Sequence, residues 1–311
     1  ENIQVSFLGA GNYSTGFLMP IFKDSGVILN SVLSESGLSA SVAQNKFKFL
    51  KSESDHKKVI ASDDVDAIVI STRHDSHATF VVDSLNAKKH IFVEKPLCIN
   101  HEQLENIVLS KQNNDNKILM VGFNRRFSPH IQKIFSLIEN IKSPKSFTMN
   151  INAGNIEKKH WLNSPEKGGG RLIGEVCHFV DLLRYLSASP IIFSSVISSS
   201  NFNDSLIINL KFEDGSIGSI NYFINGHKTV SKERLEVFVD NKILFLDNYS
   251  KLRGSGWKNF RSYKTWSQDK GQKQCIQAFI NSIKSSGNSP VPFDELVEVT
   301  KTCIDLSEQI T

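Results

Sequence analysis

The stretch IQVSFLGAGNYS, residues 3–14, decides the fold of the first part of the chain. Its first six residues are mostly apolar and predict a buried strand, and a helical pattern follows at residues 13–25. Between them, Gly9 permits a tight turn, and Gly11 lets the backbone approach a pyrophosphate at the positive N-terminus of a helix. Ser14 stands in place of the last glycine of the GxGxxG pattern. The flanking strand and helix favour a dinucleotide site over a simple turn, and no lysine follows that would indicate ATP phosphoryl transfer.

Strand and helix patterns alternate from this stretch as far as residue 122. Apolar runs that predict strands occupy residues 27–33, 65–71, 90–93 and 118–122, and helical spacing occupies residues 38–47, 77–87 and 104–112. This β-α-β-α order predicts an α/β fold with a doubly wound parallel Rossmann sheet as a dinucleotide-binding domain over residues 1–122.

The pattern changes after residue 122. Runs of period two at residues 146–152, 191–198, 206–212, 216–223 and 235–239 predict a mostly antiparallel sheet. Helical patterns at residues 129–141, 177–186, 272–283 and 294–309 complete an α+β domain over residues 123–311. The last two helices are compatible with packing back on the first domain. Residues 248–256, rich in Asn, Ser and Gly, are expected to form a loop.

Composition limits the partners that the chain is expected to have. Its 311 residues contain 36 Lys and Arg against 32 Asp and Glu, so the net charge is only +4. This weak surplus argues against nucleic acid, which needs a concentrated basic face. No apolar run reaches the roughly 18 residues of a membrane span. The four cysteines form no CxxC pair, which argues against a metal cluster and fits a reducing cytoplasm.

Two segments carry ionisable groups at positions suited to chemistry. Glu94-Lys95-Pro96 follows the strand at residues 90–93, at the sheet edge where such folds bind ligands, although a lone lysine is usually just a solvated charge. Pro96 is compatible with a cis peptide bond in a tight turn. The second segment, GGGRLIGEVCHFVD, spans residues 168–181.

Helical spacing within this second segment places three ionisable side chains on one face. Glu175, His178 and Asp181 follow each other at intervals of three residues. A buried structural histidine with a carboxylate partner is the alternative interpretation. The three glycines at residues 168–170 indicate a close approach of the backbone to another group.

The end of the second strand bears on the choice between NAD and NADP. Ser34 takes the position that is most often acidic in dinucleotide folds, and Glu35 follows it. Ser34 tolerates a 2′-phosphate, whereas an inward-pointing Glu35 repels one. Both side chains being simply solvated is the alternative, so the sequence leaves NAD or NADP open.

The glycine loop, the AKKHIFVEKP segment at residues 87–96 and the GGG-to-His segment together resemble the Gfo/Idh/MocA oxidoreductase family, which includes glucose–fructose oxidoreductase and inositol dehydrogenase. The resemblance covers nearly the whole chain. It implies an NAD(P)-dependent enzyme that transfers hydride between a nicotinamide coenzyme and a secondary alcohol or ketone of a sugar, cyclitol or sugar derivative. It also implies that the second domain, over residues 123–311, holds the substrate and has a large open sheet that pairs subunits into a homo-oligomer, a dimer or tetramer. Polysaccharide metabolism is one setting that it implies.

The resemblance assigns roles to residues of this chain. His178 is expected to act as acid or base because an imidazole titrates near neutral pH, Lys95 to bind the substrate oxygen or relay a proton, and Glu175 to orient His178. The expected coenzyme contacts are Gly9, Gly11, Asn12, Tyr13, Ser34, Thr72, His77, Glu94 and Lys95. The expected substrate contacts are Lys95, Arg125, Arg126, His160, Trp161 and His178, with structural salt bridges or core packing as the alternative for Arg125, Arg126, His160 and Trp161. No metal is expected.

Two departures from the family pattern and two other function classes remain. Gly174 stands where the family often has Asp, and Arg73 replaces the Pro of its Thr-Pro-x-x-x-His segment. One subgroup of the family is fused behind a zinc-type alcohol dehydrogenase unit. The chain resembles this subgroup in its sequence at residues 124–127, 152–154, 160–161 and 174–178. The absence of an initiating Met agrees with the chain being the C-terminal part of such a fusion. Gly174 gives weight to a non-catalytic dinucleotide-binding regulatory module. A metal hydrolase built on residues 74–77 is the third interpretation.

Overall fold

The computed structural model describes residues 2–35, 37–155, 161, 164, 166–199 and 205–310. The chain forms two compact units. The first comprises residues 1–122, 166–169 and 272–297, and the second comprises residues 123–165, 170–271 and 298–311. Within the described ranges, no helix has the length and hydropathy that crossing a membrane would require.

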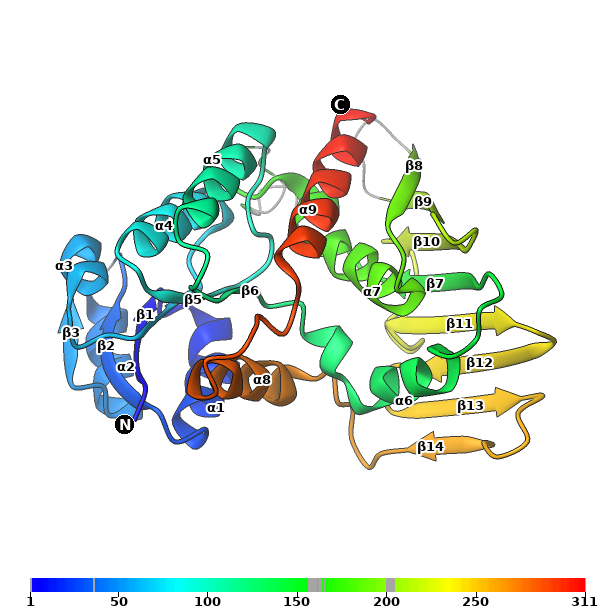
Figure 1. The fold of residues 1–311 in the computed structure, drawn as a ribbon, viewed down its shortest axis with the longest axis horizontal. Coiled ribbons are helices and arrows are strands. Elements are labelled where there is room, and N and C mark those ends of the chain that lie inside the picture. Colours follow the sequence, from blue (N-terminus) through cyan, green and yellow to red (C-terminus); the bar gives the residue numbers. More distant parts are fainter. Residues whose placement is uncertain are drawn as a thin grey trace. The chain divides into compact units, whose positions relative to one another are not determined.

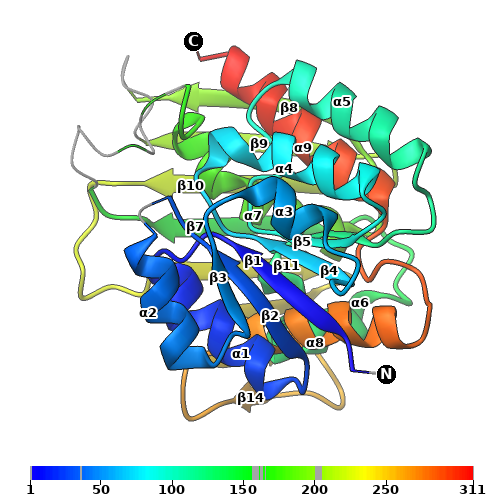
Figure 2. The ribbon, with the colours of Figure 1, turned by 90° about the vertical axis from the view of Figure 1, so that its left-hand side faces the viewer.

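Six parallel strands form the sheet of the first unit, in the order β3-β2-β1-β4-β5-β6 (Figures 1 and 2). They are β1 (Gln4–Leu8), β2 (Ile28–Leu33), β3 (Lys51–Glu53), β4 (Ala67–Ile70), β5 (His90–Val93) and β6 (Leu119–Val121). Every residue of β4 and β6 is buried, as expected for parallel strands covered on both faces. The predicted doubly wound parallel sheet is confirmed. The short edge strand β3 has no apolar run, which explains why the pattern did not reveal it.

Helices cover both faces of this sheet. They are η1 (Ser14–Leu18), α1 (Met19–Asp24), α2 (Leu38–Phe47), α3 (His56–Ala61), α4 (His74–Asn86), α5 (His101–Gln112) and α8 (Gln272–Lys284). Figure 1 shows α4 and α5 along one face and α1 and α8 along the other. On the second face, the ring of Phe22 meets those of Phe7, Phe92 and Phe279 edge-on, with centroids 5.3, 5.7 and 6.4 Å apart. Helix α8, from the far end of the sequence, is thereby part of the core of the first unit.

The second unit contains an eight-stranded sheet in the order β14-β13-β12-β11-β7-β10-β9-β8. Its strands are β7 (Ser146–Asn152), β8 (Ile191–Ser198), β9 (Leu206–Phe212), β10 (Ile217–Phe223), β11 (Glu233–Val239), β12 (Lys242–Asp247), β13 (Lys251–Ser255) and β14 (Ser262–Lys264). Among the strands that the structure describes, β7 and β10 pair in parallel and the other neighbours pair antiparallel. The predicted mostly antiparallel sheet is confirmed.

One face of this sheet is covered and the other is open. The helices of this unit are η2 (Asn124–Phe127), α6 (Pro129–Ile138), η4 (Leu172–Val176) and α7 (Cys177–Ser187). Helix α9 (Phe293–Glu308) belongs to it from residue 298 onward. Figure 1 shows α6 and α7 on the same side of the sheet. Gly218 of β10 lies directly under α7, because a Cβ there would be 2.7 Å from a methyl group of Leu183. Along β9 buried and exposed residues alternate, so its exposed side chains lie on the open face.

The expectation of a loop over residues 248–256 was wrong. Residues 251–255 form β13, which pairs with β12 and β14. The apolar alternation that marks a strand is missing here, because Leu252 is its one large apolar residue and Lys251, Arg253 and Gly254 surround it.

Candidate functional site

The glycine loop lies at the carboxyl end of β1, against the segment that follows β4. Gly9 has a φ of 109°, and a Cβ there would lie 2.6 Å from the carbonyl oxygen of Ser71. Around Gly11, by contrast, the described chain places no heavy atom within 4 Å of the Cβ position. Ser14 donates to the carbonyl of Gly9 at 3.2 Å, and its hydroxyl lies 3.0 Å from that of Ser71. Serine therefore replaces the last glycine of the motif without opening the loop.

The surroundings of this loop fit a dinucleotide. The open space over Gly11 leaves its backbone accessible to a pyrophosphate. The hydroxyl of Ser34, at the end of β2 next to β1, is buried and has no hydrogen-bond partner among the described residues. A buried hydroxyl of this kind is normally satisfied, and a ribose hydroxyl is a suitable partner. Tyr13 is 41 % exposed and stacks on Phe17 at the start of the following helix.

Replacement of the two loop glycines is expected to have different effects, on fold stability at Gly9 and on NADH affinity at Gly11. Gly9→Ala destabilises the fold by about 1–3 kcal/mol, because its Cβ overlaps the backbone at Ser71. Gly11→Val leaves unfolding unchanged and weakens NADH binding, because the new methyl groups fill the space a pyrophosphate needs. Gly16→Val is the matched control, since Gly16 also has open space around it. Urea unfolding and NADH fluorescence titration measure both effects, and wild-type NADH affinity in Gly11→Val would contradict this assignment.

A buried histidine holds the turn that contains Lys95. The Lys95–Pro96 peptide bond is cis. Nδ1 of His77 lies 2.7 Å from the carbonyl oxygen of Pro96, and its Nε2 lies 3.2 Å from that of Thr72. Burial lowers the pKa of His77, so the ring is neutral and donates to one carbonyl at a time. His77 thus connects the segment after β4 to the turn after β5, while its contact with the coenzyme stays a prediction.

Glu94 lies over the end of the neighbouring strand. A Cβ on Gly122, directly after β6, would be 2.8 Å from Oε1 of Glu94. Glycine at this position therefore makes room for the carboxylate. Together with the contacts of Gly9 and His77, this places the glycine loop, Thr72 and the Glu94–Pro96 turn at the carboxyl edge of the sheet, as the sequence predicted.

The histidines proposed for a metal hydrolase are engaged by the backbone. Nδ1 of His74 lies 2.8 Å from the carbonyl oxygen of Gly168, and burial lowers the pKa of His74 to about 3. Both nitrogens of His77 face carbonyl oxygens. Three of the four ring nitrogens are therefore turned toward carbonyls, which disfavours this pair as metal ligands.

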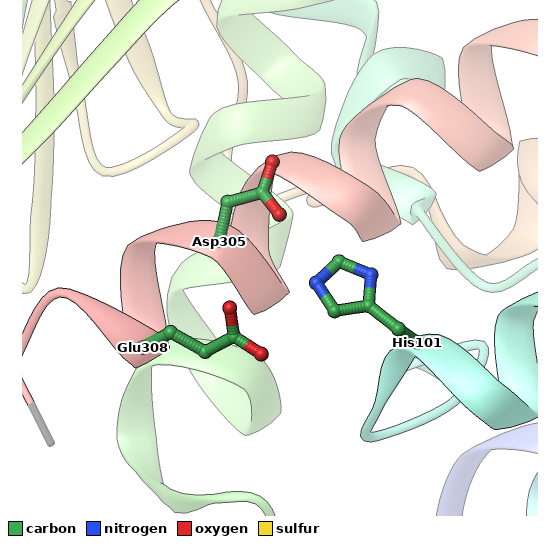
Figure 3. Close-up of side chains that lie close together, drawn as sticks. All are labelled: His101, Asp305 and Glu308. Carbon is green, nitrogen blue, oxygen red and sulfur yellow. The ribbon is translucent and has the colours of Figure 1, made fainter.

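Figure 3 draws a histidine and two carboxylates that do not define a site within either unit. His101 begins α5 in the first unit, whereas Asp305 and Glu308 project from α9 in the second. Within its own unit, Asp305 forms an ion pair with Lys301 at 3.4 Å.

In the second unit, His178 is the second residue of α7. Its side chain is nearly buried, and its ring meets that of Phe123 edge-on with centroids 6.1 Å apart. Asp181, which shares its face of the helix, is bound by Arg126 at 2.6 and 2.8 Å. The carboxylate of Asp181 therefore neutralises a guanidinium group.

Glu175 has partners that the sequence did not reveal. It lies in the π-helical turn η4, accepts a hydrogen bond from Tyr222 of β10 and lies 3.9 Å from Nη1 of Arg171. Burial and then Glu175 raise the pKa of Tyr222, so the phenol stays protonated and donates. The inward alternation of β10 was the signal that could have placed Tyr222 toward the helices. Orientation of His178 by Glu175 stays a prediction.

The predicted substrate contacts Arg125 and Arg126 form buried ion pairs. Arg125 binds both oxygens of Glu233 at 2.8 Å, and Lys270 joins the same carboxylate at 2.8 Å. Burial opposes ionisation of Glu233, but Arg125 and Lys270 overcome it and hold its pKa well below the ordinary range. Both arginines therefore form the structural salt bridges that were the alternative to substrate binding. Contact of either arginine with substrate stays a prediction.

The other two predicted substrate contacts lie in the segment after β7. Trp161 is half-buried, and its carbonyl accepts a hydrogen bond from the backbone of Ser164 at 3.1 Å. His160 lies outside the described residues. Contact of either with substrate stays a prediction.

Comparison with known proteins identifies the class. Residues 3–123 match the family model of the oxidoreductase family with an NAD-binding Rossmann fold, and residues 136–298 match that of its C-terminal alpha/beta domain. The second match covers more than half of the chain. The chain therefore belongs to the Gfo/Idh/MocA oxidoreductase family.

Individual relatives are more distant. The chain is 26 % identical over 209 residues to a myo-inositol 2-dehydrogenase of Thermotoga maritima, covering 64 % of this chain and 61 % of the relative. It is 29 % identical over 196 residues to an uncharacterized oxidoreductase, YrbE, of Bacillus subtilis, covering 60 % and 56 %. The alignments thus span less than two thirds of these curated relatives. A levoglucosan dehydrogenase in complex with NADH and levoglucosan has the same fold, with a TM-score of 0.87 and 19 % identity over 100 % of this chain and 97 % of that one.

Proposed function

We propose that the chain is an NAD-dependent dehydrogenase or reductase that acts on a secondary alcohol or ketone of a sugar, cyclitol or sugar derivative. The observation that carries the proposal is the space at the glycine loop. There the backbone of Gly11 is accessible, and the buried hydroxyl of Ser34 has no hydrogen-bond partner among the described residues. Membership of an NAD-binding oxidoreductase family supports it. The names of the relatives, myo-inositol 2-dehydrogenase and levoglucosan dehydrogenase, support the substrate class.

In such a reaction, His178 and Lys95 are assigned different roles. The nicotinamide coenzyme supplies the hydride chemistry when it is bound. Oxidising an alcohol also releases a proton, which an imidazole can take up near neutral pH, so His178 is assigned as acid and base. Lys95 is assigned to bind the substrate oxygen, and His77 holds the turn from which Lys95 projects.

A spectrophotometric assay tests the activity. The protein is mixed with NAD and, one at a time, with a panel of cyclitols, anhydrosugars, sugars and uronic acids, and formation of NADH is followed. We expect at least one polyol to be oxidised. Tight coenzyme binding with no oxidation of any compound in the panel would instead favour the regulatory module suggested by Gly174.

The setting of the chain is a separate proposal. Residues 124–127 and 174–178 resemble the unit found behind a zinc-type alcohol dehydrogenase, which supports a longer native protein. Exposed apolar side chains on the open face of β8, β9 and β10, namely Phe193, Ile207 and Ile217, support self-association. The mass of the native protein tests both, because a 34.8 kDa polypeptide that stays monomeric would contradict them.

A further inference from the structure

Four cationic side chains surround a hollow at one end of the eight-stranded sheet. The hollow measures about 410 Å³ and is lined by Lys251, Arg253, Arg261 and Lys264, with Phe245 beside them. Its volume lies within the roughly 300–1,000 Å³ typical of small-molecule sites. Four of the chain's 36 lysines and arginines therefore meet around this hollow.

We call this hollow, lined by Lys251, Arg253, Arg261 and Lys264, the basic groove. Carboxylates of the protein do not balance its positive charges. In the described part of the chain, none of the four cations forms an ion pair with a carboxylate, and no acidic residue lines the hollow. Asp247 is the cross-strand neighbour of Lys251 on β12, and it too remains outside ion-pair distance. The buried Arg125 and Arg126 of the same unit, in contrast, are each paired with a carboxylate.

The strand register makes the arrangement unfavourable without a counter-ion. Lys251 on β13 is directly opposite Lys264 on β14. Like charges directly opposite each other destabilise an antiparallel pair. A bound anion would relieve this repulsion.

Protection of a sheet edge explains only part of the pattern. Lysines on edge strands prevent pairing with other chains, and Lys264 lies on the edge strand β14. Lys251 and Arg253, however, lie on β13, which is paired on both sides. Their charges do not protect a free edge, so they need another explanation.

We propose that the basic groove binds a diphosphate anion, free or carried by a nucleoside. Two guanidinium forks match phosphate oxygens in pairs, and two ammonium groups add point charges, so the groove suits several negative charges rather than a single carboxylate. Phe245, half-buried on β12 next to Arg253, offers an apolar surface to a ring attached to the phosphates. This site is separate from the glycine loop and does not depend on the proposed activity.

Calorimetric titration of the full chain tests the site. Inorganic pyrophosphate and uridine diphosphate are titrated into the wild type, into Arg253→Gln/Arg261→Gln, and into the control Lys211→Gln/Arg234→Gln. The control removes two exposed cations from the open face outside the groove. The glycine loop is unchanged in all three proteins, so a difference between them reports the groove, and an NADH titration checks the loop.

We expect the groove variant to bind pyrophosphate at least about tenfold more weakly than the wild type, because each charged hydrogen bond contributes substantially, while the control binds normally. Tighter binding of uridine diphosphate would identify a nucleoside-linked ligand. In the wild type, pyrophosphate is also expected to protect Lys251 and Lys264 from acetylation, measured by mass spectrometry. Equal affinities in the three proteins, or no protection, would overturn the proposal. A third result would also overturn the proposal: the wild type binds no pyrophosphate but self-associates, and the groove variant does not self-associate. The groove would then be an interface between copies of the chain.

Discussion

His178→Asn is expected to lower kcat by about 10²–10⁴-fold, which is the usual contribution of a positioned acid or base. Asparagine keeps a polar side chain of similar reach but cannot exchange the proton of the alcohol. The helix should survive, because Leu182 and Leu183, which follow on α7, are fully buried and anchor it. Coenzyme binding should also survive, since the glycine loop belongs to the first unit.

Lys95→Met is expected to lower turnover in the same way. Methionine keeps much of the apolar length of lysine and loses the charge that would hold the substrate oxygen. Steady-state kinetics with the best substrate of the panel, together with NADH titration of each variant, measure the effect. Unchanged turnover in both variants would remove the catalytic assignment. Loss of NADH binding would point to a damaged fold in His178→Asn, whereas in Lys95→Met it would agree with the expected coenzyme contact of Lys95.

Glu233→Ala is expected to destabilise the second unit by about 3–5 kcal/mol, the usual cost of removing one partner of a buried ion pair. Glu233 is almost fully buried and accepts from Arg125 and Lys270. Its loss would leave the buried charge of Arg125 without this carboxylate. Urea unfolding measures the change, and Glu236→Ala, on the open face of the same strand, should change stability by less than about 0.5 kcal/mol. Equal stabilities of the two variants would contradict a structural role for the pair.

The same ion pair gives stability a defined pH dependence. The pKa of Glu233 in the fold lies well below its ordinary value of 4.5, so the folded protein holds the carboxylate ionised where the unfolded chain takes up a proton. Its contribution is therefore complete above pH 4.5 and is lost as the pH falls below that value. The difference in unfolding free energy between the wild type and Glu233→Gln should narrow over that range, and a constant difference would contradict the assignment.

The parts that sequence predicted are those encoded by local pattern. The strand and loop at residues 3–14 placed the glycine loop at the carboxyl end of β1, because a buried strand, two glycines and a helix lie there in that order. The Glu94–Pro96 turn was placed at the carboxyl edge of the sheet because parallel strands all end there. Gly9 shows how tightly such a pattern is constrained, since the backbone at Ser71 leaves no room for a Cβ.

The parts that sequence did not predict depend on residues far apart in the chain. Arg125 and Glu233 are separated by 108 residues, and no local pattern marks either as a partner of the other. Glu175 was assumed to follow α-helical spacing, whereas it lies in a π-helical turn and binds Tyr222. The basic groove was hidden because β13 lacks alternating apolar residues, so its cations were assigned to a loop.

Coenzyme binding to the intact protein tests the central claim most directly. Isothermal titration with NADH should show one molecule bound per chain, and Gly11→Val should lose that binding while unfolding at the same urea concentration as the wild type. Absence of NADH binding to folded wild-type protein would contradict the account.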